Sequence, residues 1–111
     1  MKKFKEEVVK ALLPQITLEL AQKQPIHGYA LISYIREKYG VYLGPSTVYP
    51  TLKQLEEYGF LTSEWQLTDR PRKVFTPTTT GLTLFNETAL TLRMIVSETA
   101  KLPYRLYEAV K

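Results

Sequence analysis

The sequence contains no cysteine, which excludes disulfide bonds, catalysis by a thiolate and nearly every structural zinc site. Its single histidine, His27, has no carboxylate cluster beside it, so we expect a turn or helix-capping role and no metal site. The sequence also lacks a Ser-His-Asp set, a paired-carboxylate arrangement and a phosphate-binding loop. We therefore expect neither an enzyme nor a bound cofactor.

Long apolar segments and an export signal are missing as well. No apolar run approaches the ~18 residues that a membrane-spanning helix needs. Residues 1–7 lack the hydrophobic stretch and the small-residue cleavage site of a signal peptide. We therefore expect a cytoplasmic protein with no membrane partner.

Apolar and charged residues make up 44% and 23% of the 111 residues, as in a globular protein with one modest core. The net charge of +4 is too small to identify a nucleic-acid partner, so the distribution of charge matters more. Cations gather at the N-terminus and near residue 70, and acids close to the second group should make its positive field patchy. These residues are Lys2, Lys3, Lys5 and Lys10, then Arg70, Arg72 and Lys73, and the acids Glu56, Glu57 and Glu64.

Hydrophobic spacing predicts two helical regions before residue 40. Residues 4–24 have helical periodicity with an interruption at Leu13-Pro14, since proline is tolerated only at the start of a helix. The piece before this break could belong to an interface rather than to the core. A second helix is predicted from Gly28 to Tyr39, with Gly40 as its end. Residues 41–43 are too few for a helix and are predicted to form a small edge strand.

Residues 44–59 are predicted to form the helix that carries the function. Val48, Leu52 and Leu55 recur at the helical period, and Gly59 ends the helix. The opposite face has hydroxyls and a lysine near the helix N-terminus and no carboxylate before residue 56, which suits an anionic partner. We interpret it as a DNA recognition helix whose candidate contacts are Ser46, Thr47, Tyr49, Lys53 and Gln54. The alternatives are an ordinary helix surface in which Ser46 only caps the helix, and a Tyr49 that is half-buried beside Val48.

Two short strands, at residues 60–67 and 72–76, are predicted to pair across a turn at 68–71. Trp65 and Phe75 on these strands are expected to pack in the core. Arg70, Arg72 and Lys73 near the turn suit a minor groove or flanking phosphates, and the alternative is a turn that only aids solubility. Three helices followed by a hairpin with a basic tip give a mostly α fold with a small β-hairpin wing, the winged helix-turn-helix.

A long final helix is predicted after Thr78, which is expected to cap it. Its apolar residues alternate spacings of three and four, and we predict that this seam mediates self-association. Leu102-Pro103 should end the helix, and residues 104–111 could add a further turn or two. The chain thus divides into a winged helix-turn-helix region at 1–77, with an N-terminal helical extension, and a dimerisation helix at 78–111. The seam consists of Leu82, Phe85, Ala89, Leu92 and Val96.

Four blocks of this sequence resemble the PadR family of transcriptional regulators over roughly residues 15–85. The resemblance implies a dimeric winged helix-turn-helix repressor that often responds to a small molecule, in the short form with a single C-terminal dimerisation helix. The blocks are 27–31 (HGYAL), 46–52 (STVYPTL) with Leu55, Glu56 and Gly59, 63–65 (SEW), and 70–75 (RPRKVF) running on to Thr78 and Gly81.

Three positions depart from the pattern of that family. Asp69 stands where a glycine is usual, which makes the wing short and places an acid near the expected phosphates. Pro77 replaces an aliphatic residue and is expected to end the second strand early. The final helix has no tryptophan, so the aromatic drug-stacking site of some relatives is not supported.

These features predict a homodimeric regulator, a repressor, that binds double-stranded DNA at a pseudo-palindromic operator. A small aromatic or hydrophobic ligand is a further candidate partner, in a pocket between the core and the last helix near Phe85, Met94 and the tyrosines. The alternative is a winged-helix module that binds protein instead of DNA. Glu56, Glu57 and Asp69, close to the expected DNA face, favour that alternative.

Overall fold

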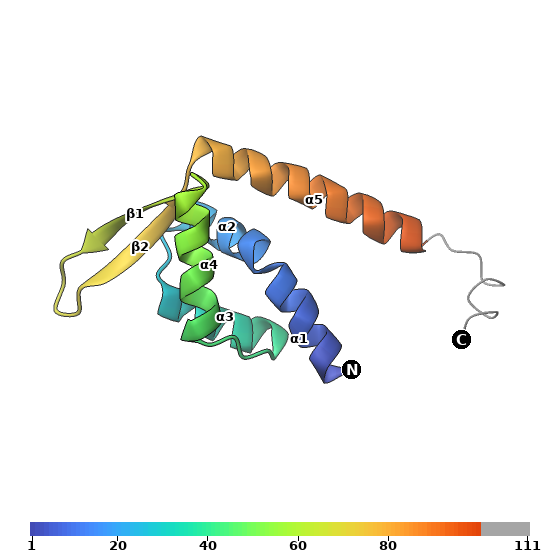
Figure 1. The fold of residues 1–111 in the computed structure, drawn as a ribbon, viewed down its shortest axis with the longest axis horizontal. Helices are drawn as coiled ribbons and strands as arrows, with labels where there is room; N and C mark the ends of the chain where they lie inside the picture. Colours follow the sequence, from blue (N-terminus) through green and yellow to red (C-terminus); the bar gives the residue numbers. More distant parts are fainter. Residues whose placement is uncertain (101–111) are drawn as a thin grey trace.

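The computed structural model describes residues 1–100, and in this part of the chain five α-helices accompany one antiparallel hairpin (Figure 1). The helices α2, α3 and α4 pack together, and the hairpin projects from them. Helix α5 begins at the base of the hairpin and runs in the direction opposite to it. The elements are α1 (Lys2–Ala11), α2 (Leu13–Lys23), α3 (Gly28–Tyr39), α4 (Pro45–Glu57), β1 (Leu61–Gln66), β2 (Arg72–Pro77) and α5 (Thr79–Ala100).

The predicted interruption near Pro14 is confirmed. Leu12 separates α1 from α2 with φ −97° and ψ 11°, and Pro14 lies in the first turn of α2, where its missing N–H costs nothing. Helix α1 contributes Val9 to the buried core, whereas Phe4 stays 72% exposed and Val8 is also exposed. The leading helix therefore anchors to the core by one side and exposes an apolar side that residues 1–100 do not cover.

The second predicted helix, α3, and its ends are also confirmed. His27 caps α3, because its Nδ1 accepts a hydrogen bond from the backbone N–H of Ala30 at 3.2 Å. Gly40 ends the helix with φ 68°, a left-handed conformation that glycine adopts without a Cβ clash. The apolar stripe of α3 is buried against its neighbours.

The predicted strand at residues 41–43 is wrong. This segment is irregular, with Val41 and Leu43 buried and Tyr42 between them exposed, so the alternation reflects a loop that packs on the core. A third extended pairing does exist, but Ile26 provides it. The backbone N–H of Ile26 donates to the carbonyl of Phe75 at 3.0 Å, and the N–H of Phe75 donates back at 2.8 Å. This bridge occupies the outer edge of β2 and ties the hairpin to the turn before α3.

The hairpin register pairs Leu61 with Pro77 at its base and Trp65 with Lys73 towards its tip. Phe75 is buried as expected, but the core position expected for Trp65 is wrong, because its side chain is 61% exposed. The hairpin extends past the helices, so only its base reaches the core (Figure 1). Strand β2 continues through Pro77 rather than ending before it; the end of a strand tolerates a proline.

The start of α5 is fixed to the turn that follows α4. The Thr78 hydroxyl accepts a hydrogen bond from the N–H of Gly81 at 3.0 Å, which confirms the predicted cap, and it donates to the Gly59 carbonyl. A Cβ on Gly81 would lie 2.0 Å from the carbonyl oxygen of Phe60, so only glycine permits this approach. Gly59 itself has φ 81°.

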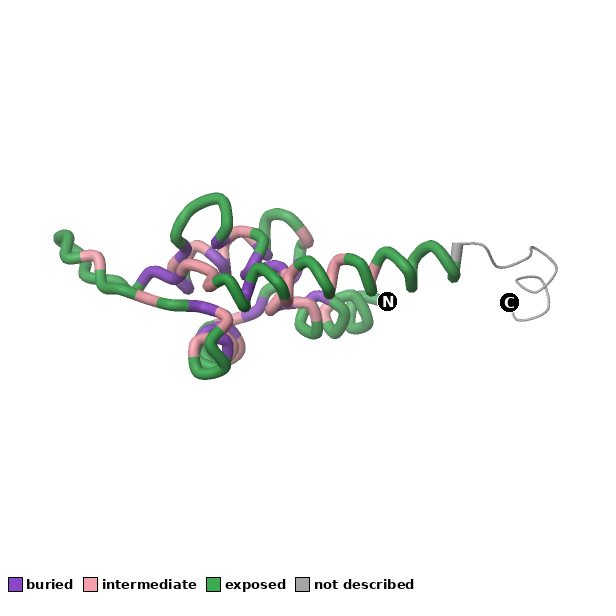
Figure 2. The backbone as a smooth tube through the Cα atoms, turned by 90° about the horizontal axis from the view of Figure 1, so that it is seen from above, coloured by how far each residue is buried: buried purple, intermediate pink, exposed green. Residues whose placement is uncertain are grey.

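The predicted seam of α5 is covered by the core only in its middle part, because Leu82, its first residue, is 37% exposed. Phe85 packs against the core, and its carbonyl accepts a hydrogen bond from Nε2 of Gln15 in α2 at 3.0 Å. Farther along, Val96 on the same stripe is 63% exposed, because α5 continues beyond the helices that it packs on (Figure 2). The expected end at Leu102-Pro103 and the further turns at 104–111 lie outside the described residues.

The His27 cap predicts a pH dependence of stability. Burial, and then the positive charge of Arg72, lower the pKa of His27 from 6.5. The cap needs a neutral imidazole, because Nδ1 accepts the hydrogen bond from Ala30 only without a proton. This contribution should be complete above pH 6.5, the value for the unfolded chain, and should be lost as pH falls through the lower folded value. Urea unfolding should therefore give a lower free energy of unfolding near pH 5 than near pH 7.5. His27→Asn, a cap that does not titrate, should weaken this dependence; an unchanged pH profile in this variant would refute the assignment.

Candidate nucleic-acid interface

Because one side of α4 is buried, the residues predicted to contact DNA lie on its solvent-exposed side. Val48, Leu52 and Leu55 are buried in the core. On the other side Ser46, Tyr49, Lys53 and Gln54 are exposed, and Thr47 is half-buried. Gly44 precedes the helix and Ser46 makes no capping hydrogen bond, so the alternative of Ser46 as a cap is excluded. The four exposed side chains therefore share one outward face.

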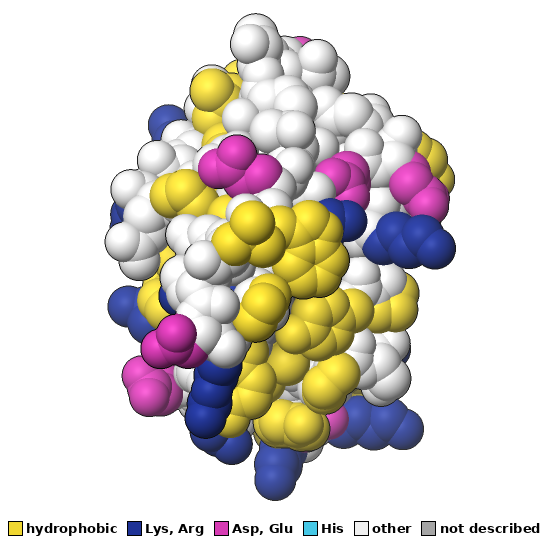
Figure 3. All heavy atoms as spheres, turned by 90° about the vertical axis from the view of Figure 1, so that its left-hand side faces the viewer, with side chains coloured by type: hydrophobic (Ala, Val, Ile, Leu, Met, Phe, Trp, Pro, Cys, Tyr) yellow, Lys and Arg dark blue, Asp and Glu magenta, His cyan; other side chains and the backbone are white. Residues whose placement is uncertain are grey.

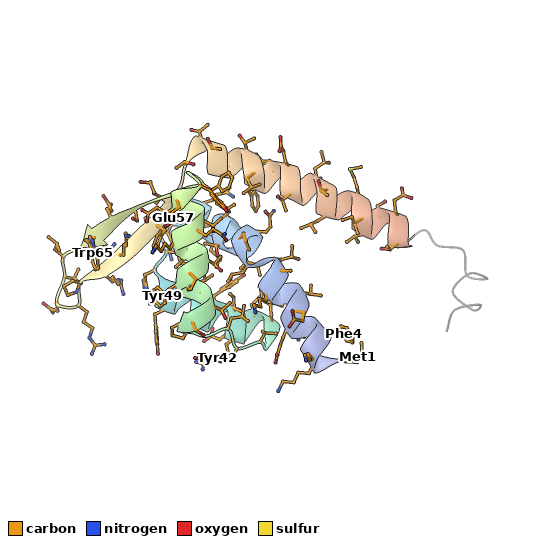
Figure 4. The ribbon with its side chains drawn as sticks, in the orientation of Figure 1. Met1, Phe4, Tyr42, Tyr49, Glu57 and Trp65 are labelled. Atoms are coloured by element: carbon orange, nitrogen blue, oxygen red, sulfur yellow. The ribbon has the colours of Figure 1, made fainter. Side chains whose placement is uncertain are left out.

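Tyr49 has a structural contact in addition to its exposed side. A Cβ on Gly28 would lie 2.6 Å from Cε1 and 2.7 Å from Cζ of Tyr49, so the tyrosine ring lies directly over the first residue of α3. The side chain remains 48% exposed (Figure 4). The Tyr49 ring thus packs on Gly28, where α4 meets α3, and its side chain is still partly exposed to solvent. The role of Gly28 was not predicted; its place directly after the cap residue was the only signal.

The three predicted wing cations differ in their surroundings. Arg72 lies on the hairpin with Nε 3.2 Å from Oε1 of Gln66, a neutral partner that leaves its charge available. Lys73, in contrast, places Nζ 3.2 Å from Oε1 of Glu56 on α4. Arg70 is in the turn, where its carbonyl accepts a hydrogen bond from the Thr68 hydroxyl. The structure therefore neutralises one of the three cations with a carboxylate.

Glu56 bridges α4 to both strands of the hairpin. Its Oε2 accepts a hydrogen bond from the Ser63 hydroxyl of β1, and its Oε1 binds Lys73 of β2. The hydrogen bond from Ser63, followed by that from Lys73 and by its charge, lowers the pKa of the Glu56 carboxyl against the opposing effect of burial. One of the three carboxylates expected to disturb the positive field, that of Glu56, is therefore occupied within the protein.

A concave surface of about 500 Å³ lies between the start of α3, α4 and the hairpin. Its lining combines aromatic rings with the wing cations, and it includes no Asp or Glu. Figure 3 shows this side of the molecule, with hydrophobic side chains gathered together and lysine and arginine side chains beside them. Such a surface suits a sugar-phosphate backbone, because cations bind phosphates and apolar groups contact sugars. The aromatic residues are Tyr29, Tyr49, Trp65 and Phe75.

The N-terminal lysines lie away from this surface. Met1 and Phe4 mark the end of α1 that points away from the hairpin and from Trp65 (Figure 4). The exposed apolar residues of α1 and of the outer part of α5 also lie away from the hairpin. The wing cations and exposed aromatic rings thus gather beside α4 and the hairpin, and the exposed apolar residues of α1 and of the outer part of α5 lie away from them.

Other kinds of site receive no support from residues 1–100. This part of the chain has no group of three or more His, Cys, Asp or Glu side chains placed to hold a metal ion. No helix within it has the length and the hydropathy that a membrane crossing requires.

Comparisons with known proteins agree with this geometry. The sequence model of the Transcriptional regulator PadR-like family matches residues 17–87. The transcriptional regulator Rv3488 of Mycobacterium tuberculosis is 33% identical over 82 residues, which cover 73% of this chain and 76% of that protein.

Solved structures share the fold. A PadR family transcriptional regulator from Eggerthella lenta superimposes with a TM-score of 0.73 at 29% identity, covering 86% of this chain and 81% of that one. A transcriptional regulator from Clostridium thermocellum gives a TM-score of 0.77 at 19% identity, covering 86% and 97%, and supports the fold alone. The family match spans more than half of the chain and includes α4 and the hairpin. The chain therefore belongs to the PadR-like family of transcriptional regulators, which are DNA-binding proteins and not enzymes.

Proposed function

We propose that this protein is a homodimeric repressor that reads a pseudo-palindromic operator in double-stranded DNA. The observation that carries the proposal is the outward polar face of α4 beside a concave surface that has cations and no carboxylate. This combination favours DNA over the alternative of a protein–protein module. Glu56, one of the three acids that favoured this alternative, is bound to Ser63 and Lys73 within the protein and is therefore not available to a partner. As a DNA-bound repressor the protein would act in the cytoplasm.

In this proposal α4 enters the major groove and the hairpin follows the adjacent backbone. Ser46, Thr47 and Tyr49, near the start of α4, contact phosphates through their hydroxyls. Lys53 and Gln54, one turn further, reach base edges. Arg70 and Arg72 neutralise phosphates beside the groove and add affinity without sequence information.

Dimerisation is proposed to use the apolar side that the core leaves open. The seam of α5 continues past Phe85 through Leu92, which is half-buried, to Val96, which is exposed, on one helical face. Exposed Phe4 and Val8 of α1 are additional apolar surface. A second copy related by a twofold axis would cover these residues and would place two α4 helices about 34 Å apart, the spacing of successive major grooves.

A ligand response is proposed on the face of α5 away from the seam. A shallow hollow of about 290 Å³ on α5 includes Leu90 and Met94, whereas Phe85 is already packed on the core. A small aromatic or hydrophobic molecule bound there would change how α5 packs and so relieve repression. Thermal shift of the dimer with a panel of such molecules, against Met94→Glu as control, tests the site.

Removing the two available wing cations tests the DNA contact. The variant Arg70→Gln with Arg72→Gln should bind random duplex DNA more weakly, because two phosphate contacts are lost. The slope of log affinity against log salt should shrink by about 0.9 per lost contact, measured by fluorescence anisotropy. The pair Lys2→Gln with Lys3→Gln, which makes the same charge change on α1, should leave the slope unaltered. Equal slopes in the wing variant and the wild type would remove the hairpin from the interface.

A charge on the open part of the seam tests the dimer. Val96→Glu should produce monomers by light scattering, because two buried carboxylates would face each other across the axis. It should also weaken binding to a two-site operator far more than to random DNA. Ser97→Glu, the neighbouring position off the stripe, should remain a dimer. A Val96→Glu protein of dimeric mass would show that α5 does not form the interface.

A further inference from the structure

The side-chain cluster of Glu56, Ser63 and Lys73 joins the recognition helix to the wing. Two oxygens of one carboxylate engage two different strands, with Ser63 on β1 and Lys73 on β2. Within residues 1–100, Glu56 is the one side chain of α4 that hydrogen-bonds to the hairpin. Glu56 lies near the C-terminal end of α4. At this end of the helix the hairpin begins and turns away from α4 (Figure 1).

The Lys73 side chain contacts α4 and the neighbouring residues of its own strand. Its ammonium lies 5.7 Å from the centroid of the Phe75 ring, in addition to the 3.2 Å contact with Glu56. Phe75 is buried and its backbone is bridged to Ile26, so this ring is a fixed part of the core. The Lys73 charge is therefore compensated by a carboxylate and an aromatic face within the protein.

The hairpin needs such a restraint. A two-stranded hairpin is at best marginally stable by itself, and the part beyond Lys73 has little cover, as the exposure of Trp65 indicates. The backbone bridge at Ile26 and the buried side chains of Val74 and Phe75 hold β2 as far as residue 74. Without the carboxylate, the distance between α4 and the part of the wing beyond residue 74, which DNA binding requires to be constant, would vary.

We propose that Glu56 and Lys73 are positioning residues for DNA binding: the Glu56 carboxylate holds both strands of the wing at a fixed place beside the recognition helix. Lys73 accordingly makes no phosphate contact, and Arg70 and Arg72 carry the wing's share of the salt dependence. The effect on affinity rests on the proposed function, whereas the restraint on the wing is a property of the free protein.

Trp65 provides a readout that needs no DNA. It is the chain's single tryptophan and lies directly opposite Lys73 in the hairpin register. In time-resolved fluorescence anisotropy, Glu56→Gln and Lys73→Gln should each increase the fast depolarisation of Trp65, and the double variant should add nothing to the larger single effect. Arg70→Gln, which removes the same charge from the turn, should leave the Trp65 decay unchanged. Unchanged dynamics in folded Glu56→Gln and Lys73→Gln proteins would overturn the proposal.

DNA binding distinguishes positioning from direct charge effects by sign. Glu56→Gln removes a negative charge near DNA, so a direct charge effect alone would tighten binding. A positioning role instead predicts about two- to fivefold weaker binding, which corresponds to the free energy of a partly exposed ion pair. Lys73→Gln should lose a similar factor at an unaltered salt slope, while a phosphate contact would reduce the slope by about 0.9. Tighter binding by Glu56→Gln, or a reduced slope for Lys73→Gln, would overturn the proposal. If the wild type binds no DNA, the proposed function fails and the Trp65 decay still decides whether the restraint exists.

Discussion

The burial of Val48, Leu52 and Leu55 against α2 and α3 is the constraint from which the functional surface follows. Each of these side chains is almost completely buried, and burial of three aliphatic groups contributes about 5 to 8 kcal/mol as an upper estimate. The exposed polar side of α4 offers nothing comparable to the free protein. The rotation of α4 about its axis is therefore decided by the core, and Ser46, Lys53 and Gln54 face outward whether or not DNA is present.

One short segment after α4 connects this helix to both other functional elements. Gly59 turns the chain with a positive φ, and the Phe60 carbonyl accepts a hydrogen bond from the N–H of Thr78 at 3.1 Å. Gly81 allows α5 to begin against that same carbonyl. Helix α4, the base of the hairpin and the start of α5 thus meet within one set of backbone contacts. A shift of α5 in a dimer would therefore be transmitted to α4 through rigid geometry rather than through a flexible linker.

Local sequence signals predicted the helices and their ends well. Periodicity located α3 and α4, Gly40 and Gly59 marked their ends, and Thr78 marked the start of α5. These features depend on residues within a few positions of one another. The helical period also predicts which side of α4 is exposed, because a buried stripe defines the opposite face.

Features that depend on distant contacts were missed. Alternation at 41–43 looks the same in an edge strand and in a loop packed on a core, and only the bridge from Ile26 to Phe75 distinguishes them. Trp65 is a large hydrophobic residue, which is why a core position was expected. It is exposed because the hairpin extends past the helices. The pairing of Lys73 with Glu56 joins residues 17 positions apart, and nothing local distinguishes Lys73 from Arg72.

We propose that α4 and the hairpin together form one surface that meets DNA. This surface can be mapped by amide chemical shifts of the isotope-labelled protein during titration with duplex DNA. The largest changes should fall on residues 44–54 and 66–72, with α1 and the outer part of α5 little affected. Changes concentrated on α1 or α5, with residues 44–54 unaffected, would contradict this proposal.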